Sequence, residues 1–355
     1  MTTTNITLSR PSGTLSHEWE RDTRPHGTRL VSDYVCPRRF FNAHVQTVWP
    51  VIRPHAKVTW RRERVDTPDH DFWDFDWLEA PADSDAPLVV LFHGLEGDSH
   101  SHYAGALMAT AARRGWRGVA PHFRGCSGEI NLTPRAYHMG DHDEIAAMLA
   151  AISARVSPRT KLYAVGVSLG GSALLNWLGR HGKNTFNVSA VAAISTPIDT
   201  VQSARTFGEG LNRQLYGRYF MRSLKKKALT LAQRHPDKID VRQIAAARTL
   251  RDFDDVFTAP LYGFENAADY YRRASSRPWL DKIAMPTLII NALNDPLVPA
   301  ESLPNESETS ACVWLEYPEE GGHAGFPTNA DPAHAWMPQR VLTFFEQHSE
   351  TSPNS

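Results

Sequence analysis

The chain has 355 residues, of which 41% are hydrophobic and 22% charged, and its 38 Lys and Arg residues almost balance its 39 Asp and Glu residues. This composition is typical of a globular protein with a substantial core, and it excludes a collagen-like or wholly disordered chain. A net charge of −1 supplies no positive field for a phosphate backbone, so we expect no nucleic-acid partner.

Cysteine spacing and hydropathy indicate the cellular compartment in which the protein is expected. Cys36, Cys126 and Cys312 lie far apart and form no C-x-x-C pair, so we expect neither a disulfide framework nor a zinc knuckle. The first thirty residues lack the basic and apolar segments of a secretory signal, and no apolar run approaches the roughly 20 residues that span a bilayer. These features predict a cytoplasmic protein without stable membrane insertion.

The chain divides into segments of different polarity. We expect a polar N-terminal arm over residues 1–34, one folded domain over residues 35–348 and a disordered tail over residues 349–355. Residues 198–281 contain many aromatic side chains but no clear buried strand. We therefore expect them to form a helical insertion that covers the rest of the domain as a lid. No pattern in the sequence indicates an oligomeric state.

Two short segments near the start of the domain predict a β-hairpin. Residues 58–64 and 71–78 flank the turn-rich sequence DTPDHD, which favours an antiparallel pair at the edge of a sheet. Trp73, Phe75 and Trp77 alternate with two aspartates. This alternation is typical of a strand with one buried face and one solvated face.

From residue 87 onward, short apolar runs alternate with helical patterns. Such runs are typical of strands buried on both faces, and the alternation predicts right-handed βαβ units around a mostly parallel sheet. Asp141 and Glu144 predict a capping box at the start of one helix. The strands are expected at 88–92, 118–123, 161–167, 188–194, 287–290 and 312–316, and the helices at 103–114, from 141, at 170–180 and around 341–345.

The sequence Gly166-Val167-Ser168-Leu169-Gly170 lies between an expected buried strand and an expected helix. A serine on a strained strand-to-helix turn projects its hydroxyl above the sheet. Small residues two positions before and after it let the strand and the helix pass closely. We therefore expect Ser168 to be a nucleophile, and the alternative is an ordinary tight turn.

A serine hydroxyl needs a general base and an orienting carboxylate, expected in the chain order serine, acid, histidine. Asp295 and His323 each follow an expected buried strand, and glycines beside His323 would let its loop reach Ser168. We expect Asp295 to be the acid and His323 the base. Asp199 is the competing acid, and a turn-forming role is the alternative for Asp295.

Attack on a carbonyl carbon creates a negative oxygen, which backbone N–H groups can stabilise. One donor is expected from Leu169, which follows the nucleophile. The other is expected from Leu95, in the loop after the strand at 88–92. His93 in the same loop is also consistent with a histidine that packs beneath an ordinary turn.

Other histidines and cysteines are weaker candidates. His100 with His102, and His138 with His142, raise the question of a metal site, but no third ligand lies at a recognisable spacing. Cys126 is interpreted as part of a tight loop, and no nucleotide-binding fingerprint occurs. We therefore interpret these histidines as surface or loop-packing residues, and a nucleotide cofactor has no support.

Several motifs occur along the chain. They are FNAHVQT (41–47), FHGLEG (92–97), FRGCSG (123–128), GVSLGG (166–171), FDD, TAP and YGF within 253–264, NDP (294–296) and GH (322–323). Through these motifs, over about residues 35 to 348, the chain resembles the α/β-hydrolase superfamily and, within it, the YheT-like esterases of hydrolase family 4. The resemblance implies an α/β-hydrolase fold and hydrolysis of carboxylic esters by Ser168, Asp295 and His323, without a metal or organic cofactor.

The residues and the resemblance together predict a serine carboxylesterase of lipid metabolism. Its expected partner is a small-molecule acyl ester of short to medium chain length, cleaved through an acyl-enzyme on Ser168. Two alternatives stay open. The same residues could transfer a medium-chain acyl group to an alcohol, or the fold could serve as a catalytically silent binding protein.

Overall fold

The computed structural model describes most of the chain, from residue 26 to residue 348. Within that range, residues 54, 183–185 and 332–333 are not described. Residues 1–25 of the expected arm and the whole expected tail, residues 349–355, lie outside the described residues.

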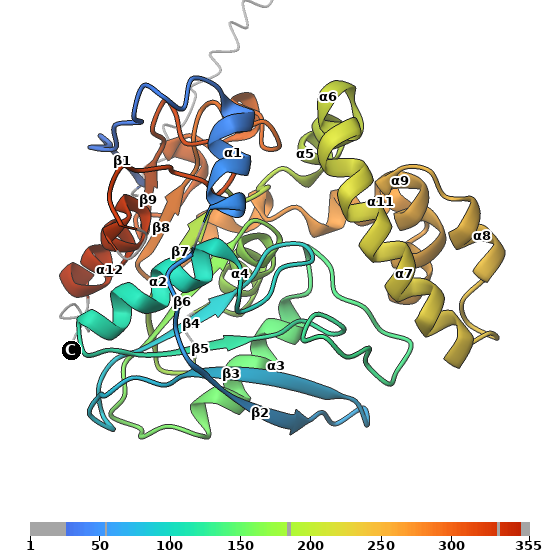
Figure 1. The fold of residues 1–355 in the computed structure, drawn as a ribbon, viewed down its shortest axis with the longest axis horizontal. Coiled ribbons are helices and arrows are strands. Elements are labelled where there is room, and N and C mark those ends of the chain that lie inside the picture. The colour runs from blue at the N-terminus through green and yellow to red at the C-terminus, as the bar shows by residue number, and fades with distance from the viewer. Residues whose placement is uncertain (1–25, 54, 183–185, 332–333, 349–355) are drawn as a thin grey trace, which may run out of the picture.

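The described residues form one nine-stranded, mostly parallel sheet with the order β1-β9-β8-β7-β6-β4-β5-β3-β2 (Figure 1). Each neighbouring pair from β1 to β5 in this order is parallel. At the other edge of the sheet, β3 pairs antiparallel with β5, and β2 pairs antiparallel with β3. The expected mostly parallel sheet with an edge hairpin is confirmed. The strands are β1 (Thr28–Leu30), β2 (Trp60–Asp66), β3 (Phe72–Leu78), β4 (Leu88–Phe92), β5 (Arg117–Pro121), β6 (Leu162–Val167), β7 (Val188–Ile194), β8 (Thr287–Ile290) and β9 (Val313–Glu316).

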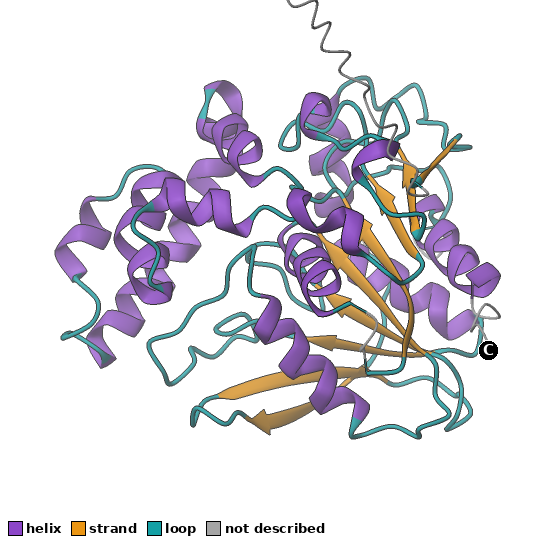
Figure 2. Ribbon diagram, turned by 180° about the vertical axis from the view of Figure 1, so that it is seen from behind, coloured by secondary structure: helices purple, strands orange, loops and turns teal. Residues whose placement is uncertain are grey.

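Helices cover both faces of the sheet (Figure 2). On β4, Val89 and Leu91 belong to a core shared with α2 and α12, whereas Val90 and Phe92 belong to a second core shared with α3 and α4. This division explains why the strand reads as a continuous apolar run. The helices outside the insertion are α1 (Ala43–Ile52), α2 (His102–Arg113), α3 (His142–Ser153), α4 (Leu169–His181) and α12 (Trp336–His348), with short 3₁₀ turns η4 (Ala300–Ser302) and η5 (Glu306–Glu308).

All the regular elements between β7 and β8 are helices. Much of this segment projects beyond the sheet, on the right of Figure 1. A separate small core, which includes Leu231, Ile244 and Phe257, holds it together. The expected helical insertion is thus present. Its elements are α5 (Thr200–Gly208), α6 (Gly210–Asn212), η1 (Arg213–Gly217), α7 (Arg218–Arg234), α8 (Val241–Ala246), α9 (Leu250–Phe253), η2 (Asp254–Thr258), α10 (Ala259–Tyr262), α11 (Ala267–Ala274) and η3 (Arg277–Lys282).

The structure differs from the expectation at the start of the chain. Residues 28–30, placed in the polar arm by the sequence, form β1 and pair in parallel with β9. Three residues are too few to show a period-2 pattern, so this strand depends on the edge that β9 offers it. No helix among residues 26–348, where described, is long and apolar enough to cross a lipid bilayer.

The expectation of a half-solvated β3 is wrong. Asp74 and Asp76, on the face expected to be solvated, are each only 1% exposed. Arg64 binds Asp74 and Arg62 binds Asp76, in both pairs through two N–H···O bonds from the neighbouring strand. Charged partners on β2 therefore allow carboxylates to be buried at positions where the sequence pattern indicated solvent.

The expected capping box at the start of α3 is only half present. Asp141 accepts a hydrogen bond from the Glu144 N–H at 3.4 Å, as expected of a cap. The Glu144 carboxylate does not return to the cap, however, because it accepts from Trp73 Nε1 at 2.6 Å and from Arg124 Nε at 2.8 Å. A buried ion pair has replaced the local interaction.

Arg124 is the centre of this buried network, and its removal should destabilise the fold. Its side chain is 2% exposed and also binds Asp71, whose side chain is 0% exposed, at 2.9 Å. Arg124→Met would leave buried carboxylates without their cation. We expect it to lower the free energy of unfolding by about 3–5 kcal/mol in urea denaturation.

Arg159→Met is the matched control, because it removes an ion pair to Asp85 from an arginine that is 84% exposed. Its cost should stay below about 1 kcal/mol. Equal losses in the two variants would show that the Arg124 network contributes no more than a surface pair.

Candidate active site

Ser168 lies on the sharp turn between β6 and α4, with φ 53° and ψ −117°, so the expected strand-to-helix turn is present. Two glycines make this turn possible. A Cβ on Gly170 would lie 2.4 Å from the Phe92 carbonyl oxygen, and one on Gly166 would lie 2.6 Å from the Gly170 carbonyl oxygen. The strain at Ser168 is therefore maintained by close backbone packing between β4, β6 and α4.

Asp295, His323 and Ser168 form one hydrogen-bonded series. His323 Nδ1 lies 2.8 Å from Asp295 Oδ2, and His323 Nε2 lies 2.9 Å from Ser168 Oγ. The Asp295 carboxylate is fully buried and also accepts hydrogen bonds from the N–H groups of Leu297 and Val298. An imidazole held in this way can accept a hydroxyl proton while the carboxylate stabilises its positive form.

The competing acid, Asp199, occupies a different role in the fold. It is the N-cap of α5 and accepts a hydrogen bond from the Gln202 N–H at 3.2 Å. Its carboxylate also lies 3.7 Å from Arg277. Of the two acids that the sequence offered, Asp295 is thus the one in contact with His323.

The two expected oxyanion donors lie in the expected places. Leu169 is the first residue of α4, and Leu95 lies in the loop that follows β4. Within the part of the chain that the structure describes, neither backbone N–H donates a hydrogen bond to another residue. Both N–H groups are therefore available to an oxygen placed beside Ser168.

His93 holds the loop that carries Leu95. Its Nε2 accepts a hydrogen bond from the Phe123 N–H at 3.1 Å, so its Nδ1 carries the proton and donates to the Gly94 carbonyl at 2.8 Å. Burial lowers the pKa of His93 to about 3, which keeps the ring neutral. The interpretation of His93 as a packed histidine beneath the turn is confirmed.

The sequence did not assign a role to helix α1, although its motif belongs to the family resemblance. Gln46 Oε1 accepts hydrogen bonds from the Gly321 N–H at 2.9 Å and from Asn294 Nδ2 at 2.8 Å. Thr47 Oγ1 accepts from the His323 N–H at 2.9 Å. These two side chains join the loops of His323 and Asp295. This supporting role is visible only in the tertiary contacts and not in the sequence.

His102 also supports the histidine loop. Its Nε2 donates to the Ala324 carbonyl oxygen at 2.8 Å, and burial lowers its pKa to about 4. Its neighbour His100 contacts the Ser99 hydroxyl at 3.2 Å. His138 is buried among the rings of Tyr262, Phe264 and Tyr270.

Cys126 lies in a turn closed by the hydrogen bond from its own N–H to the Phe123 carbonyl. Burial raises the pKa of the thiol to about 11, so the thiol is protonated at neutral pH. Lys227 Nζ lies 3.5 Å from the Cys126 sulfur and favours the thiolate, but burial has the larger effect on the pKa. The tight-loop interpretation is confirmed.

The close packing at the turn generates a prediction. Gly170→Ala would force a methyl group against two backbone carbonyl oxygens at 2.4 and 2.6 Å, and backbone atoms cannot rotate away. We expect a loss of about 1–3 kcal/mol in the free energy of unfolding, measured by urea denaturation. Gly208→Ala, in a helix with open space at the new Cβ, is the control and should change stability by about 1 kcal/mol or less. A Gly170→Ala variant as stable as the wild type would contradict the packing argument.

Comparison with known proteins agrees with this geometry. Residues 87–330 match the model of the alpha/beta hydrolase fold family. The chain is 38% identical to "Putative esterase YheT" of Escherichia coli (strain K12), over 90% of this chain and 94% of that protein. It is 30% identical to phospholipase ABHD3 of Mus musculus, over 90% of this chain and 81% of that protein.

Among solved structures, the esterase Pf2001 of Pyrococcus furiosus superposes with a TM-score of 0.53 and 14% identity, covering 92% of this chain and 98% of that chain. This likeness supports the fold alone. Together with the sequence relatives, it confirms the α/β-hydrolase fold expected from the motifs. The chain is a hydrolase that belongs to the α/β-hydrolase family and, within it, to the YheT-like esterases.

Proposed function

We propose that this hydrolase is a serine carboxylesterase that cleaves short- to medium-chain acyl esters through an acyl-enzyme on Ser168. One observation carries the proposal: Asp295, His323 and Ser168 form a hydrogen-bonded series. Leu169 follows Ser168 directly, and Gly94, next to Leu95, packs against Ser168, since a Cβ on Gly94 would lie 3.3 Å from the Ser168 Cβ. Among the described residues, the N–H groups of Leu95 and Leu169 donate to no other residue. Base, nucleophile and oxyanion donors are the three requirements of acyl transfer from an ester.

The proposed reaction has two halves. His323 Nε2 takes the Ser168 hydroxyl proton while Oγ attacks the ester carbonyl carbon, and the N–H groups of Leu95 and Leu169 donate to the resulting oxyanion. When the intermediate collapses, the alcohol leaves with the proton from His323. A water molecule, deprotonated by His323, then attacks the acyl carbon. The bond to Ser168 Oγ breaks, the acid leaves, and His323 returns the proton to the serine oxygen. Asp295 stabilises the imidazolium in both halves.

The first test removes the nucleophile. We expect Ser168→Ala to lose at least about 10³-fold in turnover of p-nitrophenyl esters from acetate to decanoate, because only binding and the oxyanion donors remain. A fluorophosphonate probe should label the wild type and not the variant. The preferred chain length in the wild type would measure the acyl pocket.

Ser172→Ala is the matched control, because Ser172 lies one turn further along α4 and its hydroxyl donates to the Pro197 carbonyl, away from the His323 series. It should keep its activity and its labelling. Equal activity in Ser168→Ala and the wild type would show that Ser168 is not the nucleophile. A wild type that is silent and unlabelled would favour a binding protein, and an ethyl ester formed in added ethanol would indicate acyl transfer.

We infer in addition that the helical insertion acts as a lid attached to the oxyanion loop. Glu96, next to Leu95, has a positive φ of 55° and a side chain that is only 5% exposed. Its carboxylate accepts hydrogen bonds from Tyr137 at 2.8 Å and from two residues of α7, Lys227 at 2.8 Å and Ser223. The insertion thus helps to hold a strained residue beside an oxyanion donor.

A second group of contacts joins the insertion to the other loops of the site. Asn212 Nδ2 donates to the Pro296 carbonyl at 2.6 Å, directly after Asp295. The Tyr216 hydroxyl lies 3.0 Å from Nδ1 of His44 on α1. These contacts support a lid whose position affects the geometry of the site.

The test of this attachment is Lys227→Met, which keeps the aliphatic stem and removes the charge. The oxyanion forms only along the reaction path, so a displaced Leu95 N–H should lower kcat by about tenfold, with KM nearly unchanged. Lys226→Met, at the exposed neighbouring position on α7, is the control and should keep its kcat. The idea fails if both lysine variants have wild-type kcat, or if both lose the same amount.

A further inference from the structure

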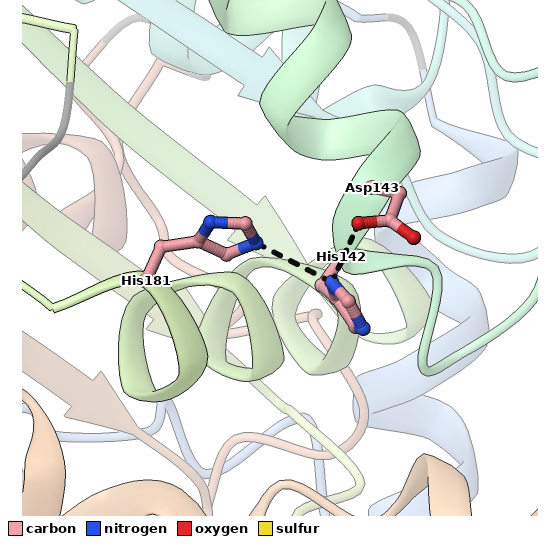
Figure 3. Close-up of side chains that lie close together, drawn as sticks. All are labelled: His142, Asp143 and His181. Carbon is pink, nitrogen blue, oxygen red and sulfur yellow. Dashed lines mark hydrogen bonds and ion pairs between the residues drawn. The ribbon is translucent and has the colours of Figure 1, made fainter.

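Three side chains of types that can bind a metal ion lie close together outside the Ser168 site. They meet where the start of α3 lies beside the end of α4 (Figure 3). His142 and Asp143 are the first two residues of α3, and His181 is the last residue of α4. His142 Nδ1 lies 3.4 Å from His181 Nε2 and 3.1 Å from Asp143 Oδ1. The three potential ligand atoms all lie within 4.8 Å of one another.

These separations match the coordination shell of zinc. With Zn–N and Zn–O bonds of about 2.0–2.1 Å in a tetrahedron, neighbouring ligand atoms lie about 3.3 Å apart. Both separations from His142 Nδ1, 3.4 and 3.1 Å, are close to this value. The Asp143 side chain is 78% exposed, so it can rotate to complete the third edge without disturbing the core.

One proton on His142 Nδ1 cannot form an in-line hydrogen bond to both of its neighbours. His142 Nδ1 faces both Asp143 Oδ1 and His181 Nε2. If it carries a proton, that proton can point in line at only one of the two. If it carries a lone pair instead, it faces the Asp143 carboxylate with no proton between them. A cation at the centre would accept lone pairs from all three atoms.

Charges of both signs surround this place. The negative dipole end of α4 at His181 favours a cation, whereas the positive end of α3 at His142 and Asp143 opposes one. Arginines also line the cleft, among them Arg180. The Arg180 guanidinium stacks over the Trp279 ring at 4.2 Å and donates to Asn176.

We propose that His142, Asp143 and His181 bind a Zn²⁺ ion that joins α3 to α4. Two imidazoles and one carboxylate are ligands that zinc prefers, and three protein ligands leave a fourth position open. His142 and Asp143 also line a cleft of about 920 Å³ between the core and the insertion. The fourth ligand is therefore a water molecule or an oxygen of a molecule bound in that cleft.

Isothermal titration of Zn²⁺ into the metal-free full chain tests the site directly. We expect one Zn²⁺ per chain and no comparable binding of Mg²⁺, which requires octahedral oxygen ligands. Each of His142→Gln, Asp143→Asn and His181→Gln should weaken Zn²⁺ binding at least about tenfold. Removal of a residue that only hydrogen-bonds to a metal ligand already costs about that much affinity, and these variants remove a ligand itself. His70→Gln, at an exposed histidine in the β2–β3 turn, should bind as the wild type does.

Two further measurements make the result decisive. Zn²⁺ should raise the melting temperature of the wild type and of His70→Gln but not that of His181→Gln, and the metal-free melting temperatures show whether each variant folds. Co²⁺ in place of Zn²⁺ should give the intense visible bands of a tetrahedral site. The proposal is overturned if the wild type binds no Zn²⁺, or if the folded ligand variants bind it as tightly as the wild type.

Discussion

Close backbone contact between β4, β6 and α4 sets the geometry of the whole site. Ser168 can hold its strained turn because Gly166 and Gly170 carry no Cβ to separate the strand from the helix. Leu169 follows Ser168 as the first residue of α4, and Gly94, next to Leu95, packs against Ser168. One packing requirement therefore determines where the Ser168 hydroxyl and the segments that carry Leu95 and Leu169 lie.

The loops around this turn are held by residues from distant parts of the chain. Thr47 on α1 binds the backbone of His323, and His102 on α2 binds the carbonyl of the next residue. Glu96, beside Leu95, is held by Lys227 of the insertion. None of these supporting groups belongs to the series from Asp295 to Ser168. Their contribution is to limit the movement of loops that would otherwise be free to shift.

The insertion and the proposed zinc site lie on either side of the same cleft. Arg273 and Tyr262 of the insertion line it together with His142 and Asp143 of the core. An ion that joined α3 to α4 would stiffen one wall of the cleft, whereas the bond from Lys227 on α7 to Glu96 attaches the insertion to the loop of Leu95. The two proposals are independent, because the zinc ligands make no contact that the proposed ester chemistry requires.

The amino-acid sequence was sufficient to predict the parallel sheet, the helical insertion and the order in which Ser168, Asp295 and His323 follow their strands. Apolar periodicity and the order of residues along the chain can be read without knowledge of any tertiary contact. The folded arrangement was needed to show that Asp295 rather than Asp199 meets the histidine, that Asp74 and Asp76 are buried, and that residues 28–30 form a strand. Each of these depends on a partner far away in the chain, and a contact between distant segments leaves no periodic signal in either one.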